Sequence, residues 1–171
     1  MEFYEQVETA SRRIPGITAV GISDSLPPSG LHDGMRYAEM VVDGRSHPAR
    51  SAGGKVVSRS VTPDYFRSLG IAIVQGRNFT EEERGSSERF MLLSKLLATR
   101  LFPGENPIGQ RVQPGANEKA PWFTVVGVAA NVKNAELNGE DDPEFYKLRR
   151  NDAADWNHSW MVWRPRYRRR L

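Results

Sequence analysis

A short segment near the middle of the chain, residues 60–79, restricts the fold more than any other part of the sequence. It runs from the end of a strand into one helical turn, and then through a glycine into a short apolar strand. Thr62 is predicted as the N-cap, with its hydroxyl accepting from a backbone N–H, and Pro63 as the first helical residue. Gly70 is predicted to end the helix in the left-handed conformation. No residue set in this segment could perform catalysis.

The composition is that of a globular protein. Charged residues make up 26% and apolar residues 39% of the 171 positions, so the chain can bury a core as one domain or as two small lobes. The net charge is only +3, and much of it lies near the C-terminus, in Arg164, Arg166, Arg168, Arg169 and Arg170. Because the rest of the chain is nearly neutral, the high pI does not indicate a nucleic-acid partner.

Several structural classes are excluded by what the sequence lacks. There is no cysteine, which excludes disulfides, thiolate nucleophiles and Cys-based zinc or iron–sulfur sites. No apolar run approaches the ~20 residues that span a bilayer. The first residues have neither the basic nor the apolar region of a signal peptide. The chain itself is therefore expected to be soluble.

Hydrophobic periodicity predicts short helices alternating with strands. A helix is predicted over residues 2–14, with Phe3, Val7, Ala10 and Ile14 at helical spacing, and another over residues 95–102 behind a Ser94 cap. Strands are predicted at residues 17–22, 35–42, 45–50, 55–61, 90–93, 110–113, 122–132, 144–148 and 160–163. The run at 122–132 is the longest apolar stretch, which predicts a central strand.

Turn and cap signals separate these elements. Asp43 and Gly44 are predicted to form a hairpin turn. Thr80 and Glu83 have the spacing of a capping box. Residues 26–30 are predicted as a loop that could act as a hinge.

The glycine spacing in residues 104–111 is that of a phosphate-binding loop. It lacks the Lys-Ser/Thr pair that would reach phosphate and metal, and Pro107 removes one backbone N–H. It also follows a predicted helix and precedes a strand, which is the reverse of the required order. We therefore interpret it as a turn.

No metal or catalytic constellation is predicted elsewhere. His32, His47 and His158 lie in separate segments without ligand spacing. Residues 140–142 form an acidic turn without the pattern of a calcium loop. The remaining candidate carboxylates each fit a turn or the start of a helix; they are Asp24, Asp64, Glu81, Glu82, Glu83 and Glu105. We predict no catalytic, cofactor-binding or metal-binding residues.

Tryptophans cluster near the C-terminus. Trp160 and Trp163 are three residues apart and so face opposite sides of a strand, while Trp156 precedes them. Core packing is the simpler interpretation, and a partner-facing or membrane-proximal surface is the alternative. The arginine-rich end is interpreted as a disordered tail, with binding to anionic lipid or nucleic acid as the alternative.

Several stretches together resemble the MacB-like periplasmic core domain, the extracytoplasmic domain of FtsX-type ABC transporter permeases, including their duplicated orphan permease branch. The resemblance is carried by residues 60–70, 76–80, 97–111 and 123–128, with further likeness at 14–21 and 25–30. The residues in these blocks that we predict to determine the structure are Thr62, Pro63, Tyr65, Phe66, Gly70, Gly76, Arg77, Phe79, Pro103, Pro107 and Gly109.

The resemblance implies a two-lobed α+β fold. Residues 29–154 would form a β-rich upper lobe with a helix. This lobe would be inserted into a membrane-proximal β-α-β lobe made of residues 1–28 and 155–171. Compared with the family pattern, the membrane-proximal lobe is incomplete at both ends. Unpaired strand edges and apolar surface are then expected, and from them self-association of the chain.

The resemblance also implies the function. The chain would be a non-enzymatic domain on the periplasmic face of the bacterial inner membrane, transmitting conformational change to a partner or substrate. Its implied partners are the membrane helices and ATPase of the parent transporter, and a periplasmic adaptor or lipoprotein, with no cofactor. One alternative is a stand-alone extracytoplasmic ligand- or peptide-binding module, which would use residues 26–33 and the tryptophans. That module requires a concave pocket with converging polar groups. A second alternative is an enzyme whose catalytic residues are scattered along the sequence.

Overall fold

The computed structural model describes residues 2–27, 35–37, 39–45, 49–50, 56–115, 119–133, 141–150 and 160–166. The helices are α1 (Glu2–Arg12), α2 (Tyr65–Leu69), the 3₁₀ helix η2 (Glu82–Gly85) and α3 (Lys95–Leu101). The strands are β1 (Ile17–Ser23), β2 (Met35–Tyr37), β3 (Glu39–Val42), β4 (Ala49–Arg50), β5 (Val56–Val61), β6 (Ile73–Gly76), β7 (Phe90–Ser94), β8 (Arg111–Pro114), β9 (Phe123–Ala129), β10 (Glu144–Leu148) and β11 (Trp160–Pro165).

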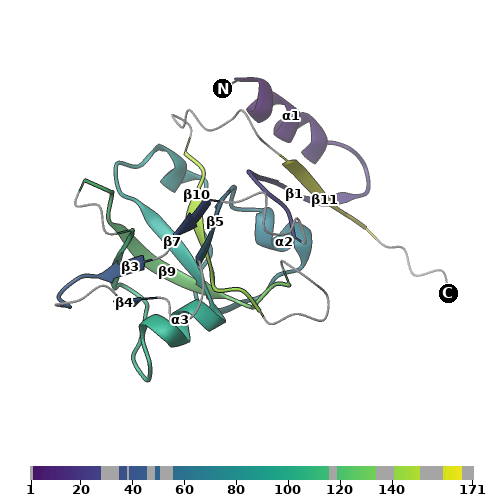
Figure 1. The fold of residues 1–171 in the computed structure, drawn as a ribbon. Helices are drawn as coiled ribbons and strands as arrows, with labels where there is room; N and C mark the ends of the chain where they lie inside the picture. The colour runs from purple at the N-terminus through teal and green to yellow at the C-terminus, as the bar shows by residue number, and fades with distance from the viewer. Residues whose placement is uncertain are drawn as a thin grey trace.

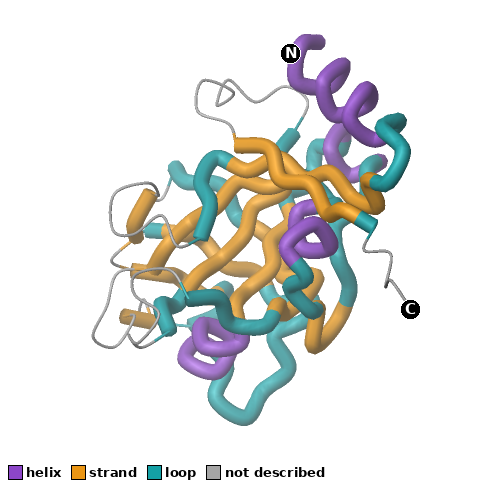
Figure 2. The backbone as a smooth tube through the Cα atoms, turned by 90° about the vertical axis from the view of Figure 1, so that its right-hand side faces the viewer, coloured by secondary structure: helices purple, strands orange, loops and turns teal. Residues whose placement is uncertain are grey.

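The strands form one mixed sheet with the order β11-β1-β5-β10-β7-β9-β8-β3-β4, and its strongly curved path is visible in Figure 2. The β5–β10 and β7–β9 pairs are parallel, and the other pairs along this path are antiparallel. β2 adds to β5, and β6 adds to β9. Few helices accompany this mixed sheet, so the predicted α+β fold is confirmed.

Two apolar clusters cover opposite faces of the central strands. Met91 and Leu93 of β7 belong to the cluster that includes α3, and Leu92 belongs to the cluster that includes Tyr65 and Phe66 of α2. Alternate residues of a strand point to opposite faces, so a strand buried on both faces is a continuous apolar run. This explains why β7 and β9, which are rich in consecutive apolar residues, lie at the centre of the sheet.

α1, β1 and β11 lie together at one end of the molecule (Figure 1). β1 pairs with β11 in an antiparallel ladder and meets β5 at its own end, where Ser23 is opposite Val61. The sheet therefore continues from the residues assigned to the membrane-proximal lobe into those assigned to the upper lobe. The lobe boundaries at 28/29 and 154/155 stay a prediction.

Several predicted elements differ from the structure. The segment predicted as one strand at 35–42 contains two strands, because β2 pairs with β5 whereas β3 pairs with β8. Gly44 has a φ of +77° in the turn after β3, where the Arg45 N–H donates to the Val42 carbonyl at 3.2 Å. Of the return strand predicted at 45–50, the described residues form a strand only at β4. The Ser94 hydroxyl caps α3 as predicted, accepting from the Leu97 N–H at 3.2 Å.

The apolar residues at helical spacing do not form the buried face of the first helix. Phe3 is 67% exposed, and Ile14, which lies beyond the end of α1, is 52% exposed. Among the side chains of α1 that the structure describes, the buried one is Glu8, at 3% exposure. Ion pairs with the rest of the molecule therefore decide which face of α1 packs inward.

Within the described part of the chain, no helix is both long enough and apolar enough to cross a membrane.

Candidate functional site

The predicted corner at residues 60–79 is present, but the start of its helix differs from the prediction. α2 begins after Asp64, which is the N-cap residue and makes no side-chain cap bond. The Thr62 hydroxyl instead accepts from the Ile22 N–H at 2.9 Å, and the Thr62 N–H donates back to the Ile22 carbonyl at 2.9 Å. The N-cap role of Thr62 and the first-turn role of Pro63 are therefore wrong, because Thr62 joins β1 to the end of β5.

The end of α2 agrees with the prediction. Gly70 is the C-cap residue with a φ of +73°, in the left-handed region that favours glycine. Arg164 of β11 donates from Nη1 to the Arg67 carbonyl at 3.0 Å, in the last turn of α2. A cation at this end also favours the helix dipole.

Two separate blocks of the predicted structural residues meet on β9. A Cβ on Gly76 would clash with the Val126 carbonyl and would lie 2.8 Å from Cδ1 of Ile108. The Gly109 N–H donates to the Val125 carbonyl at 2.8 Å. Gly76 is therefore required by close packing of β6 against β9 and the 107–109 turn.

The other predicted residues divide into packed and exposed positions. Phe66 packs against Phe79 with ring centroids 6.4 Å apart, and against Tyr65 at 5.4 Å. Arg77 lies at the surface and pairs with Glu83 at 2.6 Å. Pro107 is buried, whereas Pro103 is exposed. Whether these residues determine the fold as a set stays a prediction.

β1 and α2 pack backbone against backbone. A Cβ placed on Gly21 would lie 2.5 Å from the Tyr65 Cα and 2.8 Å from the Tyr65 nitrogen. With the two Thr62–Ile22 hydrogen bonds, this contact forms what we call the seam between β1 and the α2 corner. Real Cβ atoms do not approach a neighbour this closely, so no side chain larger than hydrogen fits at residue 21.

A group of five charged residues, here called the ion cluster, ties α1 to the same corner; it consists of Glu8, Arg12, Asp64, Glu81 and Arg84. Arg12 Nη2 lies 2.9 Å from Glu8, 3.0 Å from Glu81 and 3.5 Å from Asp64. Arg84 Nη1 lies 3.1 Å from Glu81 and 3.6 Å from Glu8. Burial raises the pKa of Glu8, and the two arginines partly offset that rise.

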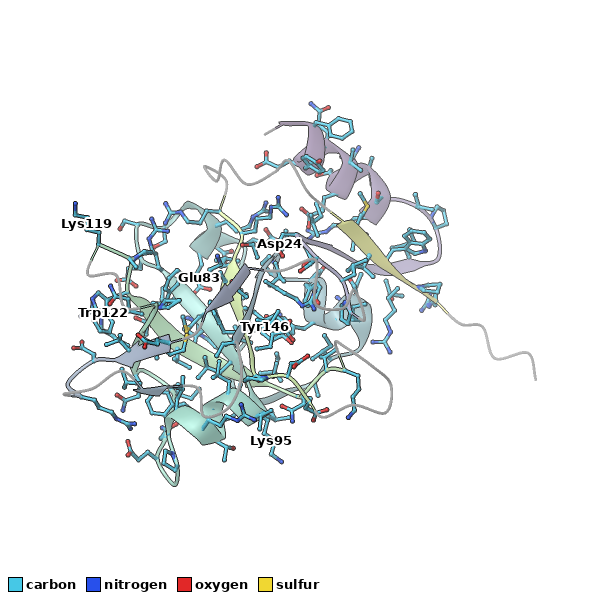
Figure 3. All side chains as sticks on the ribbon, viewed as in Figure 1. Asp24, Glu83, Lys95, Lys119, Trp122 and Tyr146 are labelled. Atoms are coloured by element: carbon cyan, nitrogen blue, oxygen red, sulfur yellow. The ribbon has the colours of Figure 1, made fainter. Side chains whose placement is uncertain are left out.

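A second polar network lies inside the sheet. Arg59 of β5 pairs with Glu144 of β10, and Arg59 Nη1 donates to the Ser25 hydroxyl at 2.8 Å. The Tyr146 hydroxyl donates to Glu144 at 2.8 Å. Figure 3 shows Tyr146 in the middle of the molecule, with Asp24 above it in that view.

Burial governs the acid–base behaviour of this network. It raises the pKa of Tyr146 well above its ordinary value, and the Glu144 carboxylate adds to the rise. Burial likewise raises the pKa of Asp24. Burial alone would lower the pKa of Arg59, but the Glu144 carboxylate together with Tyr65 and Tyr146 more than offsets it and the pKa is raised. The network is buried and holds strands together, so we assign it a structural role.

The phosphate-loop pattern and Asp141 of the acidic turn are both part of local structure. The 104–111 pattern forms turns that lead into β8. Asp141 is engaged by Lys133 at 3.0 Å and by Asn131 at 2.9 Å. Across the described ranges, no group of three potential ligands could hold a metal. His32, His47, His158 and Trp156 lie outside the described residues.

One cavity of about 410 Å³ opens where β10 ends and where β7 and β9 begin. Its wall includes Phe90, Phe123 and Leu148 together with Arg89 and Lys147. The binding-module alternative required a pocket of this kind but placed it at residues 26–33 and the tryptophans, none of which line this cavity.

The seam, the ion cluster, the polar network and the cavity were not predicted from the sequence. Arg59 did carry a signal, because a charged residue within a strand that is otherwise buried on both faces predicts a buried partner. Gly21 carried none, since a glycine that allows close backbone approach looks the same in sequence as one in a turn.

Comparisons with known proteins point in one direction. The family model for the MacB-like periplasmic core domain matches residues 4–149. The periplasmic region of MacB from Actinobacillus actinomycetemcomitans is similar in fold, with a TM-score of 0.61 over 94% of this chain at 17% identity. The extracellular domain of the noncanonic ABC-type transporter YknZ from Gram-positive bacteria gives a TM-score of 0.52 over 85% of this chain at 19% identity.

This chain spans 64% of the MacB region and 62% of the YknZ domain. A comparison with curated protein sequences found no match.

Proposed function

Because the chain belongs to the MacB-like periplasmic core domain family of ABC transporter permeases, we propose that it transmits conformational change from the membrane part of its parent to a partner or substrate, without catalysis. Its partners would be the parent's membrane helices and ATPase, and a periplasmic adaptor or lipoprotein. It would act on the periplasmic face of the membrane.

The observation that carries this proposal is the seam. A domain that transmits motion must keep its two ends in a fixed relation. The backbones of Gly21 and Tyr65 are in direct contact, so β1 and α2 have no free space in which to shift relative to each other. The ion cluster adds a second connection between α1 and the α2 corner. Both connections join residues assigned to the membrane-proximal lobe with residues assigned to the upper lobe.

A distance measurement within the domain tests this. Because the chain has no cysteine, Thr9 in α1 and Thr99 in α3, both exposed, can be replaced by cysteine and spin-labelled in a parent permease freed of other cysteines. The label-to-label distance should be the same with and without ATP. A distance that changes with nucleotide would contradict rigid transmission.

We also propose that the chain self-associates through α1 and β11. Support comes from exposed apolar residues on this unit, Phe3 at 67% and Trp163 at 58% exposure. Within the described residues, β11 pairs only with β1, so its other edge is open. Sedimentation across a concentration series should show mass rising above that of the monomer, and Trp163→Ser should reduce the rise. A monomeric mass at every concentration would exclude it.

A further inference from the structure

The cavity at the end of the sheet has no role in the transmission proposed above, since a rigid transmitter needs no ligand. Its volume of about 410 Å³ falls in the range of roughly 300–1,000 Å³ that small-molecule sites occupy. The wall is drawn from the end of β5, η2, the segment that leads into β7, the end of β8, the start of β9 and the end of β10. Six separate parts of the chain thus converge on one space.

Part of the wall is apolar. Phe90, Phe123 and Leu148 line it, together with Pro114 and Pro121. Phe123 and Leu148 are 7% and 9% exposed and belong to the two apolar clusters of the fold. Because these side chains are fixed by core packing, the apolar part of the cavity has a definite shape before any ligand enters.

The charged part of the wall is predominantly positive. It contains four cationic side chains and only two carboxylates, Glu83 and Glu88. Glu83 is already engaged, because it accepts from Arg77 Nη2 at 2.6 Å and from the Thr80 N–H at 2.9 Å. Its negative charge is thus offset by an arginine that does not line the cavity. The four cationic residues are Arg89, Lys147, Arg149 and Arg150.

The backbone of Arg149 is held in this wall. Its backbone N–H donates to the Val61 carbonyl at 2.8 Å, and its backbone carbonyl accepts from Arg84 Nε at 3.2 Å. The residue is 1% exposed, so its charge acts on the cavity through a medium of lower effective dielectric than water and not by direct contact with a ligand. Arg89 is exposed, and its guanidinium is a planar fork of donors that matches carboxylate and phosphate oxygens.

We infer that this cavity binds a small amphipathic anion, a molecule with one carboxylate or phosphate group on an apolar body. The anionic group lies among Arg89, Lys147 and Arg150, with the charge of the buried Arg149 nearby, and the apolar body lies against Phe90, Phe123 and Leu148. The positively charged part and the apolar part of the wall enclose the same space. The positive charge excludes cations as ligands, and the apolar part favours an amphipathic anion over a purely polar one.

Probes that share one alkyl chain and differ in head group test the inference on the full chain. Octanoate, octyl phosphate and octylammonium are titrated against the ¹⁵N-labelled protein, with inorganic phosphate as the head group alone. We expect saturable amide shifts at Phe90, Phe123 and Leu148 with octanoate, octyl phosphate or both. We expect at least roughly tenfold weaker binding of octylammonium and inorganic phosphate.

Two matched charge changes locate the site. Arg89→Gln removes a cation from the wall, and Arg67→Gln removes one from the exposed face of α2, outside the wall. Arg89→Gln should weaken binding of the anionic probe roughly three- to tenfold, and Arg67→Gln should leave it unchanged. The inference is overturned if no anionic probe saturates, if octylammonium binds as tightly, if inorganic phosphate alone binds as tightly, or if both variants behave alike.

Discussion

Gly21 in β1 and Tyr65 in α2 touch through their backbones, and a Cβ on residue 21 would lie 2.5 Å from the Tyr65 Cα. The two residues are far apart in sequence and lie on opposite sides of the predicted lobe boundary. Residue 21 must therefore be glycine for β1 and the α2 corner to pack as they do.

Gly21→Ala should destabilise the chain by about 1–3 kcal/mol, because the added methyl group meets backbone atoms that cannot rotate away. Gly85→Ala is the matched control, since a Cβ there meets nothing within 4 Å. Urea denaturation measures both. The close approach would be refuted if the two variants had equal midpoints.

Two buried tyrosines should respond oppositely to loss of the hydroxyl. The Tyr146 hydroxyl donates to Glu144 at 2.8 Å, so Tyr146→Phe removes one hydrogen bond to a buried carboxylate and should cost about 1–3 kcal/mol. The Tyr65 hydroxyl is buried and has no hydrogen-bond partner in the described part of the chain. Tyr65→Phe should therefore be neutral or stabilising. Thermal unfolding of the two variants side by side distinguishes these outcomes, and a larger loss for Tyr65→Phe would contradict the network.

Substitutions of Gly70 test its left-handed conformation through their effect on stability. Gly70→Val places a β-branched residue at a φ of +73° and a Cβ 3.3 Å from Arg164 Nη1, so it should cost about 1 kcal/mol or more. Gly70→Asn should cost less, because asparagine tolerates this region. Unchanged melting of the valine variant would show that the assigned helix end is wrong.

Glu8 should give the chain a pH-dependent stability of definite sign. Its pKa is raised above the ordinary 4.5 by burial, although Arg12 and Arg84 lower it and Glu81 and Asp64 add to the rise. The folded state therefore holds this proton more tightly than the unfolded state. The stabilisation it contributes is complete below pH 4.5 and is lost as pH rises through the folded pKa.

The free energy of unfolding of the wild type relative to Glu8→Gln should accordingly fall as pH rises from acid to neutral. Denaturant titrations of both proteins across this range measure the difference. A relative stability that rises with pH would show that the arginines dominate burial at this carboxylate.

Local signals in the sequence predicted much of the fold. Gly70 could be assigned because its neighbours alone require a left-handed residue, and Ser94 because its cap is three residues from its donor. The prediction that Thr62 is the N-cap was wrong for the opposite reason. A residue distant in sequence, Ile22, supplies its hydrogen-bond partner, and that tertiary contact displaced the local cap.

The remaining features depend on distant pairs that periodicity cannot reveal. Phe3, Val7 and Ala10 have helical spacing, but the residues outside α1 that pair with Glu8 and Arg12 lie more than fifty residues away in the sequence, and the face that carries Glu8 is the one that packs inward. The cavity likewise forms only when Arg89, Phe123 and Lys147 come together from separate parts of the chain.

The claim that the domain transmits motion through the seam is tested most directly by measuring whether ATP moves the upper part of the domain. In the parent permease, a label at Thr99 and a second label in the membrane-embedded part report whether ATP displaces the α3 side of the domain. We expect the distance to change with ATP in the wild type and in Gly85→Ala. The change should shrink in Gly21→Ala and in Arg12→Gln while ATP hydrolysis continues. No change in the wild type, or an undiminished change in Gly21→Ala and Arg12→Gln, would contradict transmission through the seam.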